Sequence, residues 1–183
     1  MSASGSRRAV LVPVVIIVVL TALSIVGIVM LEQNKKSLPA PLQTLMGGRV
    51  VRIVGVAMYP TLQEGQVVTF DTRSYLDQAP QRGDIVLFIA PDNPSRVLIK
   101  RVIAIPGDRL LISNGTVSIN GQVISEPYLA AGWAVFTSWP PSGQATTVPA
   151  NQYFVMGDNR DHSSDSRAFG YISRTSILGK LLR

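Results

Sequence analysis

Few residues in this sequence are able to do covalent or acid–base chemistry. The chain has no cysteine, which excludes disulfides, thiolate metal sites and cysteine nucleophiles. Its single histidine, His162, stands in the polar run 161–165, which is typical of a solvated loop. Arg160 and Arg167 lie among the nearby carboxylates Asp158, Asp161 and Asp165, so ion pairs are expected there rather than a metal site. We therefore expect neither a metal centre nor a cofactor.

Lys100 is the clearest candidate for acid–base chemistry. It is the only lysine from residue 37 to residue 179, and it stands in the apolar run 97–103. At the two-residue period of a strand, Lys100 shares a face with Leu98 and Val102. Burial on that face would lower the pKa of the amine, and a neutral lysine can act as a general base near pH 7. The alternative is a lysine at a strand edge whose ammonium group reaches water.

A lysine base needs a hydroxyl group to activate, and segment 54–62 has a suitable form. It looks like a strand that ends in an exposed turn set by Pro60. Position 57 in this turn, however, is alanine.

Short strands are the elements that must position these residues. Five of them are expected, at 49–56, 66–70, 84–89, 97–105 and 152–156. The stretch 110–124 contains two Asn-Gly pairs, Asn114-Gly115 and Asn120-Gly121, which indicate tight hairpin turns. Beyond a short turn near 74–79, no helical period is evident in this part of the chain. The predicted fold class is mainly β, a coiled antiparallel sheet or barrel-like domain.

The amino-terminal part predicts a membrane anchor. Residues 9–31 form one uncharged apolar run, and about 20 such residues are enough for a helix to span a bilayer. A cleaved signal peptide, the alternative, would have a shorter apolar core of about 7–15 residues. Arg7 and Arg8 favour a cytoplasmic amino terminus. We expect residues 1–8 in the cytoplasm, 9–31 as a single transmembrane helix, 32–48 as a linker and 49–183 as an extracytoplasmic β domain.

The formal net charge of +6 at pH 7 needs an explanation. Nucleic acid is a common partner for such a charge, but the arginines here are scattered, and the β domain is expected outside the membrane. A surface close to the anionic headgroups of a lipid bilayer is favoured, and no nucleic acid is expected as a partner. Trp133 and Trp139 would either rest at the membrane interface or cap the core.

Four segments, in order, resemble the conserved boxes of bacterial type I signal peptidases, and the resemblance covers essentially the whole chain. Residues 57–62 look like the nucleophile box of that family, which normally begins with serine. A structural strand box, the lysine box and the last box are matched by residues 82–86, 100–108 and 157–167.

The resemblance implies a membrane-bound serine endopeptidase of the Ser/Lys type in the bacterial cytoplasmic membrane. Such an enzyme cleaves signal peptides from exported preproteins after small residues. Ala57 would occupy the nucleophile position, Lys100 would be the general base, and Ser163 would orient the Lys100 amine. The N–H of residue 57 would form part of the oxyanion hole, and Gly55 stands where many relatives supply a second donor from a serine hydroxyl.

The resemblance also implies a substrate groove and two structural ion pairs. The peptide would bind as an added strand beside residues 53–56 and 97–100. Pockets for its small side chains would be lined by Ile53, Met58, Leu62, Leu98 and Ile99. The ion pairs would join Asp158 to Arg101 and Asp165 to Arg167.

Alanine at position 57 sets this chain apart from the family pattern. A methyl group cannot attack a carbonyl, so the chain as written is expected to form no acyl-enzyme. Either a serine was replaced deliberately or this is a natural inactive relative, and the retention of Lys100 and Ser163 favours the replacement. The alternative function is a non-catalytic membrane-anchored domain that binds signal peptides. A repressor-like self-cleaving protein would need a DNA-binding helical domain where this chain has the apolar run 9–31.

Overall fold

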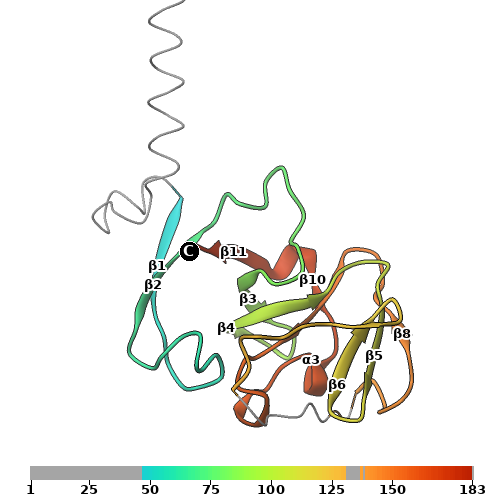
Figure 1. The fold of residues 1–183 in the computed structure, drawn as a ribbon. Coiled ribbons are helices and arrows are strands. Elements are labelled where there is room, and N and C mark those ends of the chain that lie inside the picture. The colour runs from blue at the N-terminus through green and yellow to red at the C-terminus, as the bar shows by residue number, and fades with distance from the viewer. Residues whose placement is uncertain (1–46, 131–136, 138, 183) are drawn as a thin grey trace, which may run out of the picture. The chain divides into compact units, whose positions relative to one another are not determined.

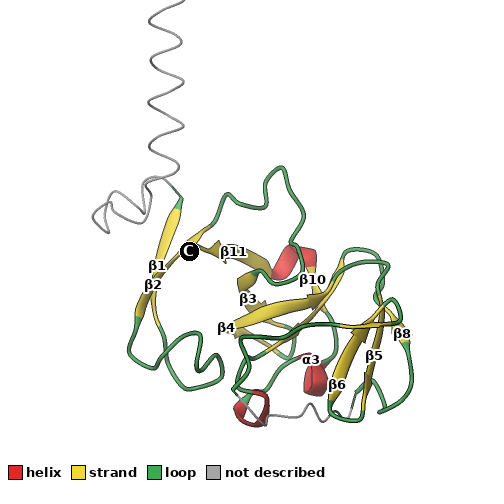
Figure 2. Ribbon diagram, viewed as in Figure 1, coloured by secondary structure: helices red, strands yellow, loops and turns green. Residues whose placement is uncertain are grey.

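The computed structural model describes residues 47–130, 137 and 139–182. The expected cytoplasmic segment 1–8, the anchor 9–31 and nearly all of the linker 32–48 lie outside these residues, as does Trp133. Among the residues that are described, no helix has the length and apolar character needed to cross a bilayer. Strands dominate the described part of the chain, which confirms the mainly β prediction (Figure 2).

The larger sheet has seven strands in the order β1-β2-β11-β3-β4-β9-β10, and every neighbouring pair is antiparallel (Figure 1). β3 and β4 lie near its centre, and β11 returns from the carboxyl-terminal end of the chain to lie between β2 and β3. The strands are β1 (Gly48–Arg52), β2 (Val67–Asp71), β3 (Ile85–Ala90), β4 (Asn93–Ala104), β9 (Gln152–Met156), β10 (Ile172–Ser173) and β11 (Ile177–Leu181).

The smaller sheet has four strands in the order β7-β6-β5-β8, again all antiparallel. They are β5 (Arg109–Ser113), β6 (Thr116–Ile119), β7 (Gln122–Val123) and β8 (Thr146–Thr147). An apolar cluster joins the two sheets, because residues of β5 and β6 pack against the ends of β4 and β9. Trp139 packs against this cluster, with its ring centroid 4.8 Å from that of Tyr171, and so caps the core.

Two Asn-Gly pairs form the tight turns of the smaller sheet, as the sequence predicts. All four residues of Asn114-Gly115 and Asn120-Gly121 have φ between 50° and 84°, the left-handed region that Asn and Gly tolerate. Each pair is a two-residue loop, since Ser113 pairs with Thr116 and Ile119 pairs with Gln122.

Helical structure in the described residues is limited to single turns near the carboxyl-terminal part of the chain. Asp165 caps the amino end of α3 (Ser166–Phe169), because its side chain accepts a hydrogen bond from the Arg167 N–H. The other turns are η2 (Arg160–His162) and η3 (Arg174–Ser176).

One predicted strand is too long, because residues 53–56 are not part of it. A strand was expected over 49–56, but β1 ends at Arg52 and the chain turns away, with Gly55 at a φ of 80°. The loop that follows is closed at its base, because the Ile53 N–H donates to the Gln66 carbonyl (2.8 Å) and the Gly65 N–H donates to the Ile53 carbonyl (2.9 Å). Residues 54–64 therefore form a loop held against the sheet rather than a strand within it.

Candidate active site

Ala57 lies on a turn that is held in place by the last box. The carbonyl of Ala57 accepts a hydrogen bond from the Asn159 N–H (3.0 Å), and the carbonyl of Val56 accepts one from Asn159 Nδ2 (3.2 Å). The Val56 carbonyl also accepts from the Tyr59 N–H (3.0 Å), which closes the turn. Because a trans peptide is planar, the Ala57 N–H points away from the Val56 carbonyl and so away from Asn159.

Lys100 is almost completely buried in the centre of β4. The residue is 3% exposed, so it is not a strand-edge lysine that reaches water, and Nζ donates to the Ile99 carbonyl (3.0 Å). Burial lowers the pKa of the amine to about 8, because the ammonium form is poorly solvated there. The negative charge of Asp165 raises this pKa and the positive charge of Arg96 lowers it, both less strongly than burial. A substantial fraction of the amine is therefore neutral near physiological pH.

Ser163 brings a buried hydroxyl close to the Ala57 turn. Its Oγ has no hydrogen-bond partner among the described residues. A β-carbon placed on Gly157 would overlap with both the Ser163 hydroxyl and the Ala57 carbonyl oxygen, so these three residues meet at one point. Only glycine fits at position 157 without displacing one of its neighbours.

A cavity of about 300 Å³ joins the turn to the lysine strand. Ala57 and Lys100 both line it. Four of the five residues expected to form substrate pockets also line it: Ile53, Met58, Leu98 and Ile99. The fifth, Leu62, is buried in the apolar cluster beneath the cavity, together with Ile53 and Met58.

Two ion pairs connect the last box to the lysine strand and to its own helix turn. Arg101 contacts Asp158 through two hydrogen bonds, Nε to Oδ1 (2.8 Å) and Nη2 to Oδ2 (2.6 Å), and both side chains are almost fully buried. Asp165 pairs with Arg167 (2.9 Å) and also accepts from the Gly157 N–H (3.0 Å). The segment that contacts the Ala57 turn is thus fixed to β4 at one point and to α3 at another.

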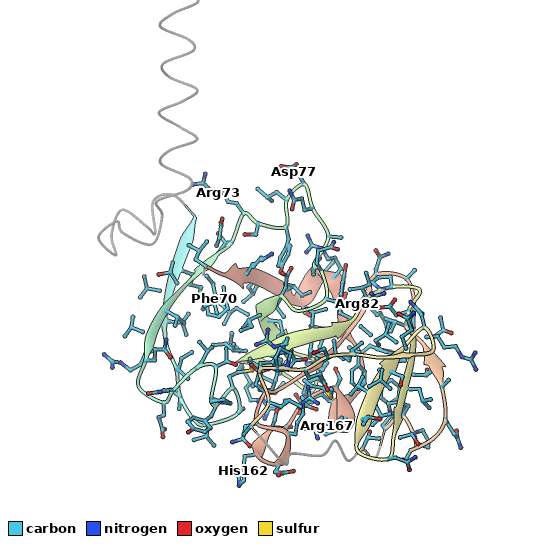
Figure 3. All side chains as sticks on the ribbon, in the orientation of Figure 1. Phe70, Arg73, Asp77, Arg82, His162 and Arg167 are labelled. Atoms are coloured by element: carbon cyan, nitrogen blue, oxygen red, sulfur yellow. The ribbon has the colours of Figure 1, made fainter. Side chains whose placement is uncertain are left out.

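The Gly55 backbone and the His162 side chain have different surroundings. The Gly55 N–H, a candidate donor for an oxyanion, donates to Glu64 Oε1 (3.3 Å) in this structure. His162 is exposed at the surface, 3.2 Å from Asn159 Oδ1, as expected for a loop histidine (Figure 3).

The sequence analysis did not predict that segment 124–130 contacts the arginines of the candidate site. Glu126 pairs with the fully buried Arg160, and Tyr128 lies against Arg101 with its ring centroid 3.9 Å from the guanidinium carbon. One signal was present, because Glu126 is the only charged residue from 110 to 157. An isolated carboxylate in an otherwise uncharged stretch suggests a buried partner, but the identity of that partner depends on the fold.

The sequence is similar to those of known proteins over most of its length. Residues 8–182 match the family described as "Signal peptidase, peptidase S26". The chain is similar to a probable signal peptidase I-2 of Synechocystis sp., 37% identical over 131 residues, which are 68% of this chain and 56% of that protein. It is also similar to signal peptidase I V of Bacillus subtilis, 38% identical over 136 residues, which are 70% of this chain and 80% of that protein. A crystal structure of a signal peptidase I from Enterococcus faecalis aligns with a TM-score of 0.48 at 36% identity, over 57% of this chain and 98% of that one.

Proposed function

Because this chain belongs to the signal peptidase family of peptidase S26, we propose that it has the architecture of a membrane-bound serine endopeptidase of the Ser/Lys type, with Ala57 at the nucleophile position. Its substrates would be exported preproteins, cleaved after small residues at the end of their signal peptides. The observation that carries the proposal is the buried Lys100 amine, which lines the same cavity as Ala57. Residues 9–31 would anchor the domain in the bacterial cytoplasmic membrane and place residues 49–183 on its outer side.

With a serine at position 57, the chemistry would follow from the surroundings of Lys100. The neutral amine would take the proton from the serine hydroxyl as its oxygen attacks the scissile carbonyl carbon. The proton would then pass to the departing amine of the mature protein, leaving an acyl-enzyme that water hydrolyses. The buried hydroxyl of Ser163 would hydrogen-bond the Lys100 amine and hold it in the required orientation, and the N–H of residue 57 would stabilise the developing oxyanion.

Apolar residues on both sides of the cavity fit an extended peptide with small side chains. Residues 53–55 and residues 97–99 line the cavity, so a peptide could bind between these two segments as an added strand. Val54 at one rim is 88% exposed, and Val97 at the other is also exposed. Ile53 and Met58, which are both buried, add to the apolar lining of the cavity.

Alanine at position 57 supports a second candidate function, a non-catalytic domain that binds signal peptides without cutting them. The cavity walls do not depend on the missing hydroxyl, so peptide binding would survive its loss. Both an introduced replacement and a natural inactive relative are consistent with this arrangement. In either case we expect the chain as written to release no product.

The decisive experiment restores the hydroxyl. Ala57→Ser, in detergent or lipid with a preprotein substrate, should cleave after a small residue, and Ala57→Ser combined with Lys100→Ala should not. The rate should rise with pH with an apparent pKa near 8, since only the neutral form of Lys100 accepts the proton. Intact substrate bound tightly by both variants would favour the binding domain, and a rate that appears only near pH 10 would contradict a desolvated Lys100.

A further inference from the structure

Segment 124–130, here named the strap, leads from the smaller sheet to the candidate site. It follows β7, and its first residue is held to β6 by a hydrogen bond from the Ile124 N–H to the Val117 carbonyl (3.0 Å). Ile124 packs against the apolar cluster between the sheets, whereas Glu126 and Tyr128 contact arginines near the cavity. The strap thus connects an apolar framework to a charged site.

Glu126 supplies the counter-charge for Arg160. The Arg160 side chain is fully buried, and its guanidinium contacts both carboxylate oxygens of Glu126, with Nη1 to Oε2 at 3.1 Å. Through Nε, Arg160 also donates to the Gly157 carbonyl (3.0 Å). Glu126 therefore holds an arginine that fixes the residue in contact with Ser163 and the Ala57 turn.

Tyr128 contacts Arg101, the second arginine that the strap reaches. Its ring covers the guanidinium of Arg101 at 3.9 Å, a cation–π contact, and its hydroxyl donates to Glu126 Oε1 (2.6 Å). Arg101 is the neighbour of Lys100 on β4 and the partner of Asp158. Tyr128 therefore links the Glu126–Arg160 pair to the Arg101–Asp158 pair.

We propose that Glu126 and Tyr128 are positioning residues, which hold segment 157–160 and the lysine strand in register so that Lys100 faces the residue at position 57. Segment 157–160 carries the Asn159 contacts to the Ala57 turn, and it is fixed through Arg160 and through Asp158. The strap contacts both arginines that make these attachments, Arg160 through Glu126 and Arg101 through Tyr128. What the positioned site does rests on the proposed function, but the positioning itself does not.

The positioning can be measured in the chain as it stands, with Ala57 in place. The pKa of Lys100 reports how well its surroundings exclude water, and NMR of isotope-labelled lysines can follow it because the chain has only three others. Tyr128→Leu should raise this pKa from about 8 towards the ordinary value of 10.5, since a loosened strap would admit water to the amine. Tyr171→Leu is the matched control, because Tyr171 is also half-buried but packs on Trp139 and Phe154. It should leave the Lys100 pKa unchanged.

An equal loss of thermal stability in both variants, with no change in the Lys100 pKa of either, would overturn the proposal. If Tyr128→Leu does not fold, Tyr128→Phe decides instead. It keeps the ring over Arg101 but removes the hydrogen bond to Glu126, so a smaller rise in the Lys100 pKa is expected. An unchanged value in a folded Tyr128→Phe would overturn the proposal equally.

Activity provides a separate readout in the Ala57→Ser background. Glu126→Gln and Tyr128→Leu should each lower kcat by roughly 10- to 100-fold with little change in KM, as expected when reacting groups are misplaced by about an ångström. A rise in KM alone would assign the strap to substrate binding and contradict the positioning role. If Ala57→Ser cleaves nothing, the proposed function fails, while the Lys100 pKa still decides whether the strap positions the site.

Discussion

Two regions of this protein bury different kinds of side chain. The cluster between the sheets, which the smaller sheet completes, is apolar throughout, from Ile112 and Val117 to Phe154. The lysine strand and the last box instead bury charged groups: Lys100, Arg101, Asp158, Arg160 and Asp165. Burying a charge is costly unless it is paired, and within the described residues Lys100 alone of these five has no oppositely charged group at ion-pair distance. The difference indicates that the lysine strand gives up stability to hold one amine, with its pKa lowered to about 8, at the cavity that Ala57 also lines.

The largest effect is expected when the charge pairing of the larger sheet is broken. Asp158→Asn removes the negative charge that neutralises Arg101, and leaves a guanidinium that is 4% exposed without its partner. Removal of one member of a buried pair costs about 3–5 kcal/mol, so the free energy of unfolding should fall by that amount. Denaturant titration of the two proteins measures this difference.

The matched substitution in the apolar cluster is Ile112→Val. Ile112 is as deeply buried as Asp158, but the loss of one methylene group should lower the free energy of unfolding by only about 0.5–1.5 kcal/mol. It should also leave the activity of an Ala57→Ser protein unchanged. If Asp158→Asn and Ile112→Val lowered the free energy of unfolding by similar amounts, the contrast between the charged site and the apolar cluster would be wrong.

A second prediction concerns Lys100, the buried charge without an ion-pair partner among the described residues. Lys100→Met replaces the buried amine with an apolar side chain of similar length, and should raise the free energy of unfolding at pH 7. The pKa of Lys100 falls from 10.5 to about 8 on folding, and each pKa unit corresponds to about 1.36 kcal/mol, so the gain should be roughly 3 kcal/mol.

The pH dependence distinguishes this explanation from better packing by methionine. Between pH 8 and pH 10.5 the unfolded chain keeps the Lys100 proton while the folded chain releases it, so stability should rise with pH across this window. The destabilisation is fully present below pH 8. Lys100→Met should remove this rise, and a gain that is the same at pH 7 and pH 10.5 would show that packing alone is responsible.

The same contrast explains how far the sequence predicted the structure. The hairpins of the smaller sheet could be predicted because Asn-Gly turns and alternating apolar residues are local signals. β9 was predicted with its correct bounds, 152–156. The short strands β8 and β10 were missed because two residues carry no measurable period, and β11 was missed because its pairing with β2 and β3 joins distant parts of the chain.

The candidate site was predicted only in part from the sequence. Its segments could be recognised because they resemble a family pattern, and the apolar run around Lys100 predicted burial. The loop at 53–56 was read as strand because its apolar residues line a cavity rather than a sheet. Glu126 and Tyr128 could not be placed, since nothing near them in the sequence contains the arginines that they contact.

The smallest effect on stability is expected at the Asn114-Gly115 turn of the smaller sheet. Asn114 has a φ of 50°, and replacement by alanine should cost about 1 kcal/mol, because a β-carbon without a local hydrogen-bonding group is disfavoured in the left-handed region. Asn114→Gly, which tolerates that region, should cost less, and both variants should leave the pKa of Lys100 at about 8. Thermal unfolding and lysine NMR measure the two quantities on the same samples. A shift of the Lys100 pKa in Asn114→Ala would mean that strain in the β5–β6 turn reaches the site, and that the apolar sheet and the charged site are not energetically separate.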